Sequence, residues 1–262
     1  MMKQIEITKY LNKEYPEELA SHFDSGKISL QFGSNNKEIK KVMIALDGTT
    51  DVVNQAIDSN CDLLICHHPF MFSPLLSLNY DSPFGQKLIK VLNNKLNIFS
   101  MHTNFDTGID GMNDILSNEL GLKNVNYIKD ELDASCLLRI GNIDKITLAD
   151  LIKEVSDKLN QPSIKYVGDP NKIIEKVGIV GGAGSSEVYN AIRNKCDCFI
   201  TGEIQHHIGL DAIDQGICLI EVSHAVEAVF KSKLKDKLNN EFPELEIILA
   251  NEEDPFKTYC KK

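Results

Sequence analysis

Six residues able to bind divalent metal ions occur in three pairs: His67 and His68, His102 and Asp106, and His224 and Glu227. Imidazole and carboxylate together suit zinc, iron, manganese, cobalt or nickel, whereas calcium takes oxygen ligands. Five or six donors exceed what one tetrahedral catalytic ion uses while keeping a position open for water. The set therefore favours two ions, which can lower the pKa of a bridging water and make it a nucleophile at neutral pH.

The first pair follows an unbroken apolar run, Leu63 to Cys66, and precedes Pro69. Such a run is typical of a strand buried on both faces of a parallel sheet. Ligands of open α/β sheets bind at the carboxyl ends of the strands. Because adjacent side chains of a strand point to opposite faces, both imidazoles can serve one site only if the chain turns at His67 and His68.

The chain repeats itself. Residues 42–66 align without a gap on residues 177–201, an offset of 135, with eight of 25 positions identical. Each copy has the pattern strand, turn, helix, strand, which predicts a βαβ unit with a parallel strand pair. At an offset of 121, the apolar strands at 97–101 and 217–222 also align, and a histidine and a carboxylate follow each. Self-similarity at so long a period indicates two related lobes.

We therefore expect an α/β fold of two similar lobes related by internal duplication, with a metal site in the cleft between them. The N-terminal lobe is predicted at 1–130, with residues near the C-terminus as candidates to pack on it, and the C-terminal lobe at 131–262. Without an inserted domain or flexible linker, the two should form one rigid unit.

The spacing within each pair decides whether both members can reach one site. His224 and Glu227, three residues apart, would share one face at the start of a helix. His102 and Asp106 would do so only if a turn of helix forms there, for which the local signal is weak. A single histidine is more often a hydrogen-bonded structural imidazole; the repetition of His and carboxylate at related strand ends favours metal binding.

Four further polar residues are candidates for the cleft. Asp47 follows a predicted strand and is either a cleft residue or the N-cap of the next helix. Glu203 aligns with His68 at the offset of 135. His206 and His207 either line the mouth of the cleft or cap the helix expected from Ile208 to Gln215.

The turn from Gly181 to Ser186 lies between a predicted strand and a helix. It is either a plain turn or an anion contact through the backbone amides of Gly182, Gly184 and Ser185. It matches neither a P-loop nor a dinucleotide fingerprint.

Composition excludes several classes of protein. The 262 residues, 42% hydrophobic and 25% charged, are typical of a globular protein, and a net charge of −10 makes nucleic acid an unlikely partner. No membrane span or signal peptide is evident, so we expect a cytoplasmic protein.

The seven cysteines are interpreted as buried core residues, since no second close pair completes a zinc site with Cys196 and Cys198.

The chain resembles the NGG-one-interacting-factor-three-like family, whose members are also called GTP cyclohydrolase 1 type 2 homologs. The similarity covers nearly the whole chain. It is carried, in order, by Ala45-Leu46-Asp47 with Thr49, Asp62 to Pro69, His102 to Asp106, Gly111 to Asp114, Thr201-Gly202-Glu203 with His206-His207, and Ser223-His224 with Glu227.

The resemblance implies a dinuclear site with His67, His68, Asp106, His224 and Glu227 as ligands and His102 nearby. It also implies a toroidal homohexamer, a trimer of dimers. The expected function is a metal-dependent hydrolase acting on a small, nucleotide-like substrate, with GTP ring-opening as the concrete version. The alternative is a non-catalytic protein that binds or handles metal or recruits a partner. No individual catalytic residue is identified.

Overall fold

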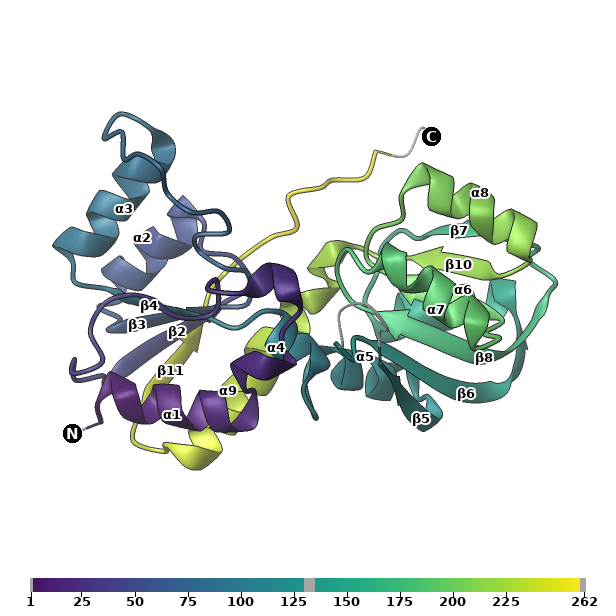
Figure 1. Cartoon of the computed structure of the whole chain (residues 1–262), viewed down its shortest axis with the longest axis horizontal. Helices are drawn as coiled ribbons and strands as arrows, with labels where there is room; N and C mark the ends of the chain where they lie inside the picture. The colour runs from purple at the N-terminus through teal and green to yellow at the C-terminus, as the bar shows by residue number, and fades with distance from the viewer. Residues whose placement is uncertain (1, 130–134, 260–262) are drawn as a thin grey trace. The chain divides into compact units, whose positions relative to one another are not determined.

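The computed structural model describes residues 2–129 and 135–259, and the chain divides into two compact units (Figure 1). Unit 1 comprises Met1–Phe105 and Ala228–Glu253, and unit 2 comprises Asp106–Glu227 and Asp254–Lys262. The division lies earlier than the expected boundary at residue 130, because the helix and strand that follow Phe105 pack on the sheet of unit 2. Residues 228–253 return to unit 1. That the units form one rigid body stays a prediction, and Cys260 lies outside the described residues.

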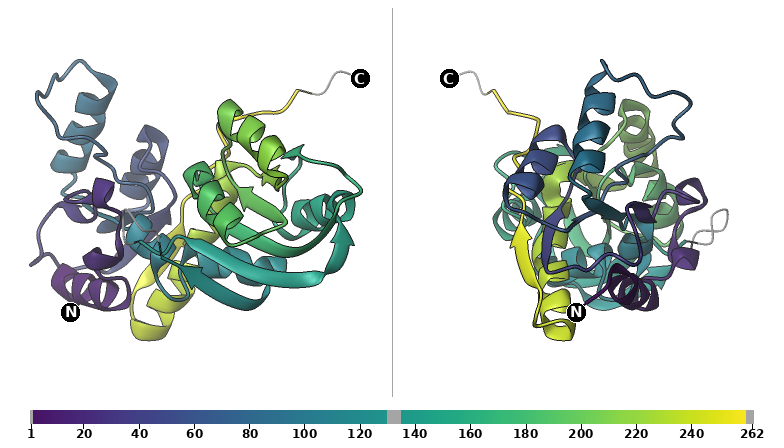
Figure 2. Two further views of the ribbon diagram at one scale, coloured as in Figure 1. Left: turned by 45° about the vertical axis from the view of Figure 1, so that its right-hand side comes forward. Right: turned by 90° about the vertical axis from the view of Figure 1, so that its left-hand side faces the viewer.

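Unit 1 is a five-stranded sheet covered by helices on both faces. Its strand order is β1-β4-β3-β2-β11, and all neighbours are parallel except β1, an antiparallel edge strand. Figures 1 and 2 show α2 and α3 on one face and α1 and α9 on the other. The elements are α1 (Gln4–Glu14), the 3₁₀ helices η1 (Glu17–Leu19) and η2 (His22–Asp24), β1 (Ser29–Phe32), β2 (Lys41–Ala45), α2 (Thr50–Asp58), β3 (Leu63–Cys66), α3 (Pro83–Asn93), β4 (Asn97–Ser100), α9 (Val229–Glu241) and β11 (Glu246–Leu249).

Unit 2 contains a six-stranded mixed sheet in the order β5-β6-β8-β9-β10-β7. Helices α7 and α8 pack against the apolar cluster on one face, and α5 and α6 contact β6 and β8. The elements are α5 (Met112–Leu120), β5 (Lys123–Ile128), β6 (Leu138–Thr147), α6 (Leu148–Lys158), β7 (Lys165–Val167), β8 (Ile173–Val180), η3 (Ser185–Glu187), α7 (Val188–Arg193), β9 (Cys198–Thr201), α8 (His206–Gln215), β10 (Cys218–Glu221) and η4 (His224–Ala228). The short helix α4 (Thr103–Thr107) contains the crossing from unit 1 to unit 2.

The two units repeat one arrangement of strands. The parallel pair β2–β3 has Val42 opposite Leu63, and the pair β8–β9 has Val177 opposite Cys198, each residue 135 positions later. The pair β3–β4 matches β9–β10 in the same way, with Asn97 and Cys218 related by the offset of 121. The predicted parallel βαβ pairs are therefore confirmed in both halves.

The backbone contacts beneath these strands repeat as well. Asp62 Oδ2 accepts hydrogen bonds from the N–H groups of Lys40 and Lys41, and Asp197 Oδ2 accepts from those of Glu175 and Lys176. Lysines at equivalent positions, Lys37 and Lys172, donate to the carbonyls of the two aspartates.

Local sequence signals explain where several helices begin and end. The side chains of Thr49, Ser82 and Thr147 cap α2, α3 and α6 by accepting an N–H three residues on. Gly121 ends α5 in the left-handed conformation, which glycine adopts without steric cost. Among the described residues, no helix combines the length and the apolar character needed to cross a bilayer.

Five of the six described cysteines are buried in the core, as expected, whereas Cys136 is only half-buried. Burial raises the pKa of the Cys61 thiol to about 11 and that of Cys196 to about 12, so both thiols stay protonated at neutral pH. A thiol binds metal as the thiolate, so these side chains are inert. Cys198 and Cys218 lie opposite each other on β9 and β10, both buried.

Arg139 on β6 is the largest fully buried side chain and anchors the chain just after Asp106. Its Nε donates to Asp114 Oδ1 at 2.5 Å, and its Nη2 donates to the Thr107 carbonyl at 2.8 Å. The hydroxyl of Tyr127 donates to the other Asp114 oxygen at 2.8 Å, and the Tyr127 ring lies 4.0 Å from the Arg139 guanidinium carbon. This buried ion pair ties α5 and the Thr107 backbone to the sheet.

We expect Arg139→Met to destabilise the protein by about 3 to 5 kcal/mol, because it leaves Asp114 buried without its cation. Lys123→Met is the matched control. Its ion pair with Asp144 is exposed to solvent, so its loss should change the stability far less. Urea unfolding measures both, and equal destabilisation by the two variants would contradict this account.

Candidate metal centre

Unit 1 gathers three imidazoles at the carboxyl ends of β3 and β4. One ring nitrogen from each of His67, His68 and His102 lies within 4.8 Å of the others, a spacing at which the three could hold a metal ion. The rings of His67 and His68 are 5.0 Å apart, so the chain turns at these residues as a shared site requires. His67 is fully buried, and the rings of Phe105 and Phe230, which contact each other, lie against it.

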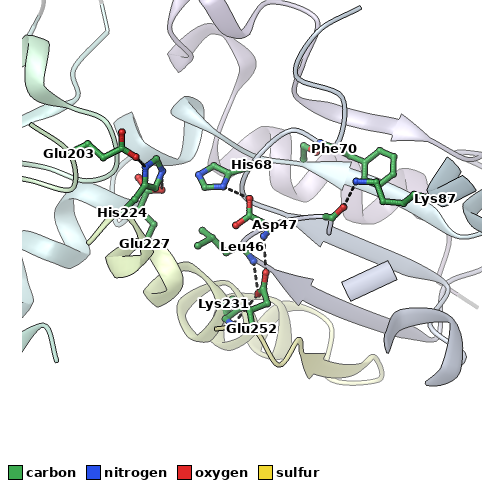
Figure 3. A network of polar contacts seen from close by, with 12 residues as sticks. Leu46, Asp47, His68, Phe70, Lys87, Glu203, His224, Glu227, Lys231 and Glu252 are labelled. Carbon is green, nitrogen blue, oxygen red and sulfur yellow. Dashed lines mark hydrogen bonds and ion pairs between the residues drawn. The ribbon is translucent and has the colours of Figure 1, made fainter. Parts of the chain in front are cut away.

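A carboxylate orients His68. Nδ1 of His68 donates to Oδ1 of Asp47 at 2.8 Å, since an ionised carboxylate can only accept (Figure 3). Nε2 is then the nitrogen that remains for a metal ion, and a carboxylate partner of this kind is usual behind metal-binding histidines. The N-cap of α2 is Thr49 and not Asp47, because the Thr49 hydroxyl is the group that accepts from Val52 N–H.

The loop that carries Asp47 is held from two sides (Figure 3). Glu252, close to the end of β11, accepts the backbone N–H groups of Leu46 and Asp47, both at 2.9 Å, and forms an ion pair with Lys231 at 3.1 Å. On the other side, Lys87 Nζ donates to the Gly48 carbonyl at 2.7 Å and lies 4.3 Å from the centre of the Phe70 ring. Burial lowers the pKa of Lys87. These contacts fix the Asp47 carboxylate, and through it the His68 ring.

His102 is oriented in the same manner by Asp24. Its Nδ1 lies 2.9 Å from Oδ1 of Asp24, a fully buried carboxylate that also accepts from the hydroxyl of Thr103 at 2.5 Å. Burial by itself raises the pKa of Asp24, but the hydrogen bonds from His102 and Thr103 and the charge of His102 outweigh it and lower that pKa. Asp24 is therefore a carboxylate at neutral pH and leaves Nε2 of His102 for other partners.

Unit 2 holds a second group of donors. Nδ1 of His224 lies 2.6 Å from Oε1 of Glu203, and Nε2 of His224 lies 3.2 Å from Oε2 of the buried Glu227 (Figure 3). Two donors about 2.1 Å from one tetrahedral ion are about 3.4 Å apart, so the separation of these two atoms fits a shared ion. His224 and Glu227 both lie in the 3₁₀ helix η4, which places the two side chains on one side of the helix, as their spacing predicts.

Asp106 lies in α4, so the turn of helix for which the sequence signal is weak does form. Asn113 links this segment to the rest of unit 2: its Nδ2 donates to the Asp106 carbonyl at 3.1 Å, and its Oδ1 accepts the Gly181 N–H at 2.8 Å. Asp106 is buried, with 7% of its surface exposed. The Asp106 backbone and the glycine turn are thereby fixed to each other.

The glycines of that turn make room for the donors. A Cβ on Gly182, which has φ +55°, would lie 2.5 Å from Glu227 Oε1 and 3.2 Å from His224 Nε2. A Cβ on Gly202 would lie 2.6 Å from the Gly182 carbonyl. The N–H groups of Gly181 and Gly184 donate to Asn113 and Thr201, which supports the plain-turn interpretation. Anion binding through Gly182, Gly184 and Ser185 stays a prediction.

The two other candidate histidines are exposed. His206 and His207 are the first two residues of α8, which begins two residues earlier than expected, with Gln205 at the N-cap and no side-chain capping bond. They therefore do not cap the helix.

Sequence reasoning missed three residues that position the site. Each acts through a hydrogen bond to a residue elsewhere in the chain. The bond of Asp24 spans 78 positions, that of Asn113 spans 7, and that of Glu252 spans 206. Asn113 stands in a segment shared with the resembling family, but neither Asp24 nor Glu252 has a spacing that points to its partner.

We expect Asp47→Ala to weaken metal binding about 10- to 100-fold, because the His68 ring loses the partner that orients it. Asp51→Ala on the exposed start of α2 is the matched control and should bind as the wild type does. Competition with a chelator for Co²⁺ measures both affinities, and unchanged binding by Asp47→Ala would show that Asp47 does not position the site.

Gly182→Ala should weaken Co²⁺ binding more than tenfold, because the added methyl group displaces Glu227 and His224. Gly216→Ala is the control: its φ is +71°, but a Cβ there has no atom within 4 Å. Both variants carry the cost of a left-handed alanine, about 1 kcal/mol, visible as a small drop in Tm. Only the first should lose metal affinity, and equal affinities would refute the steric role of this glycine.

Comparisons with known proteins identify the family of this chain. Residues 2–255 match the family model described as Duf34/NIF3 (NGG1p interacting factor 3). A GTP cyclohydrolase 1 type 2 homolog of Clostridium acetobutylicum is 30% identical over 252 residues, 92% of this chain and 93% of that protein. The crystal structure of the Staphylococcus aureus hypothetical protein SA1388 superimposes with a TM-score of 0.90 at 29% identity, covering 98% of this chain and 99% of the other. The chain therefore belongs to the Duf34/NIF3 family.

Proposed function

We propose that the donors of the two units bind one pair of divalent metal ions and that the protein is a metal-dependent hydrolase. The proposed ligands are His67, His68, Asp106, His224 and Glu227, with His102 beside them. The observation that carries the proposal is the orientation of three imidazoles: His68, His102 and His224 each have Nδ1 held by a carboxylate, so each keeps Nε2 for a metal ion.

The covalent chain supports a site shared by both units. Within unit 1, Phe105 and Phe230 pack on the His67 ring, with ring centroids 6.3 and 5.2 Å away. Asp106 directly follows Phe105, and Glu227 precedes Phe230 by three residues, a stretch of chain that spans at most about 11 Å. The chain crosses between the units at these two carboxylates. This connectivity supports the proposal that both carboxylates serve the same site as His67.

The internal repeat supports the same proposal. Equal strand registers at a constant offset are the pattern that duplication of one βαβ unit leaves, and we infer that origin here. His68 and Glu203 stand at equivalent positions after β3 and β9. In unit 1 the histidine at this position is oriented by Asp47, whereas in unit 2 the glutamate at this position orients His224. Each unit thus offers donors at the same end of its sheet.

A pair of such ions supplies a hydroxide nucleophile at neutral pH and polarises the bond that it attacks. The residues of the chain orient the donors: Asp47, Asp24 and Glu203 hold the rings, and the Lys231–Glu252 pair holds the loop of Asp47. Because its relatives carry the name GTP cyclohydrolase 1 type 2 homolog, GTP is the first substrate to test.

The shared site is tested by the metal content of protein purified without added metal. We expect about two ions per chain in the wild type. We expect each of two single variants, His67→Ala in unit 1 and Glu227→Gln in unit 2, to weaken the binding of both ions. The loss of one ligand should lower the metal affinity by more than about 100-fold. Glu241→Gln, at the exposed end of α9, is the matched control. If each variant lost one ion and bound the other normally, the units would bind metal independently.

Hydrolysis is tested with metal-loaded protein and GTP under single-turnover conditions, with products identified by mass spectrometry. We expect the wild type and Glu241→Gln to convert the substrate and Glu227→Gln to be inactive. If fully loaded protein leaves GTP and a panel of other nucleotides unchanged, the hydrolase proposal fails and non-catalytic metal binding is the function that stands.

A further inference from the structure

Two exposed phenyl rings flank His102 on the surface of unit 1. Phe23 and Phe72 are each 52% exposed, and their ring centroids lie 6.0 and 6.4 Å from that of His102, both nearly perpendicular to it. Exposed apolar side chains occur elsewhere on this chain, but these two rings gather around one imidazole. His102 in turn contacts the rings of His67 and His68, so this aromatic pair borders the candidate metal ligands.

A lysine lies against both rings. Nζ of Lys27 is 3.9 Å from the centre of the Phe72 ring and 5.6 Å from that of Phe23. Within residues 2–129 and 135–259 its ammonium forms no ion pair with a carboxylate, so its charge is available to an anion. In a chain of net charge −10, this ammonium places a positive charge next to two exposed aromatic rings and close to the candidate metal ligands.

Phe23 lies in the 3₁₀ helix η2 and Phe72 in the segment after β3, and Gln31 on the edge strand β1 joins Lys27 to Met71, the neighbour of Phe72. Its Nε2 donates to the carbonyls of Lys27 and Met71, at 2.8 and 3.3 Å, and its Oε1 accepts the Met71 N–H at 3.2 Å. The Ser100 hydroxyl, at the end of β4, donates to the same Oε1 at 2.9 Å. The backbones beside Phe72 and at Lys27 are therefore fixed to the sheet and to each other, which preorganises the pair.

We propose that Phe23, Phe72 and Lys27 form a subsite for a flat aromatic heterocycle that carries an anionic group, as a nucleotide does. The heterocycle stacks on the phenyl rings, and the Lys27 ammonium pairs with the anion. The inference rests on the proposed function, because it assigns the substrate class to that same site: a heterocycle held there lies next to His102.

The test measures binding to metal-loaded full-length protein by calorimetry, with three probes. GMP carries both the ring and the anion, guanosine only the ring, and ribose 5-phosphate only the anion. We expect Phe23→Leu and Phe72→Leu each to weaken GMP and guanosine binding about tenfold, or about 1.4 kcal/mol, and to leave ribose 5-phosphate unchanged. Lys27→Gln should weaken GMP and ribose 5-phosphate severalfold but not guanosine.

Matched controls are Phe256→Leu, an exposed phenylalanine of unit 2, and Lys9→Gln, on the exposed side of α1. Absence of GMP binding by the wild type, or wild-type affinity in all three subsite variants, overturns the inference. The segment after Phe72 also exposes Leu75 and Leu76. If Phe72→Leu changes the oligomeric mass of the protein, a second copy of the chain covers this surface, and the inference is overturned as well.

Failure of the subsite and failure of the proposed function give different results. If the phenylalanine variants hydrolyse GTP with wild-type KM, the subsite is wrong and the hydrolase stands. If GMP binds through the three residues but metal-loaded protein converts no nucleotide, the subsite stands and the hydrolase is wrong.

Discussion

The candidate site depends on hydrogen bonds between a carboxylate and Nδ1 of an imidazole. An exposed histidine rotates about two side-chain bonds and exchanges its proton between two nitrogens, so it presents no fixed donor. Asp47, Asp24 and Glu203 remove both freedoms for His68, His102 and His224. The three carboxylates come from different parts of the chain, yet they act in one way, and each leaves Nε2 as the donor.

The fold supplies these carboxylates with rigid supports. In unit 1 the Asp47 loop is fixed by Glu252 from the C-terminal part of the chain, whose strand β11 pairs with β2 and whose helix α9 packs on the same sheet. In unit 2 the buried Arg139 holds the backbone after Asp106, and Asn113 joins Asp106 to the glycine turn. Buried polar groups with all their partners present define one geometry, because any shift leaves a group without a hydrogen bond in a medium of low dielectric constant.

Close packing around Glu227 is a second constraint. The turn after β8 approaches the carboxylate so closely that a Cβ at position 182, where φ is also positive, would displace it. The equivalent turn after β2 contains Asp47-Gly48 instead, and there Asp47 reaches His68. The two turns thus differ in what they give the donors of their own unit: the turn after β2 provides a carboxylate, and the turn after β8 leaves room by lacking side chains.

The sequence by itself determined the buried strands, their parallel pairing, the repeat at offsets of 135 and 121, and the polar residues that follow the strand ends. It could do so because apolar runs, helix caps and short spacings act over a few residues. The tertiary structure alone decided which carboxylate holds which histidine, that Thr49 and not Asp47 caps α2, and that the chain divides after Phe105. These depend on contacts between residues as far apart as Leu46 and Glu252, and no local pattern encodes such a pair.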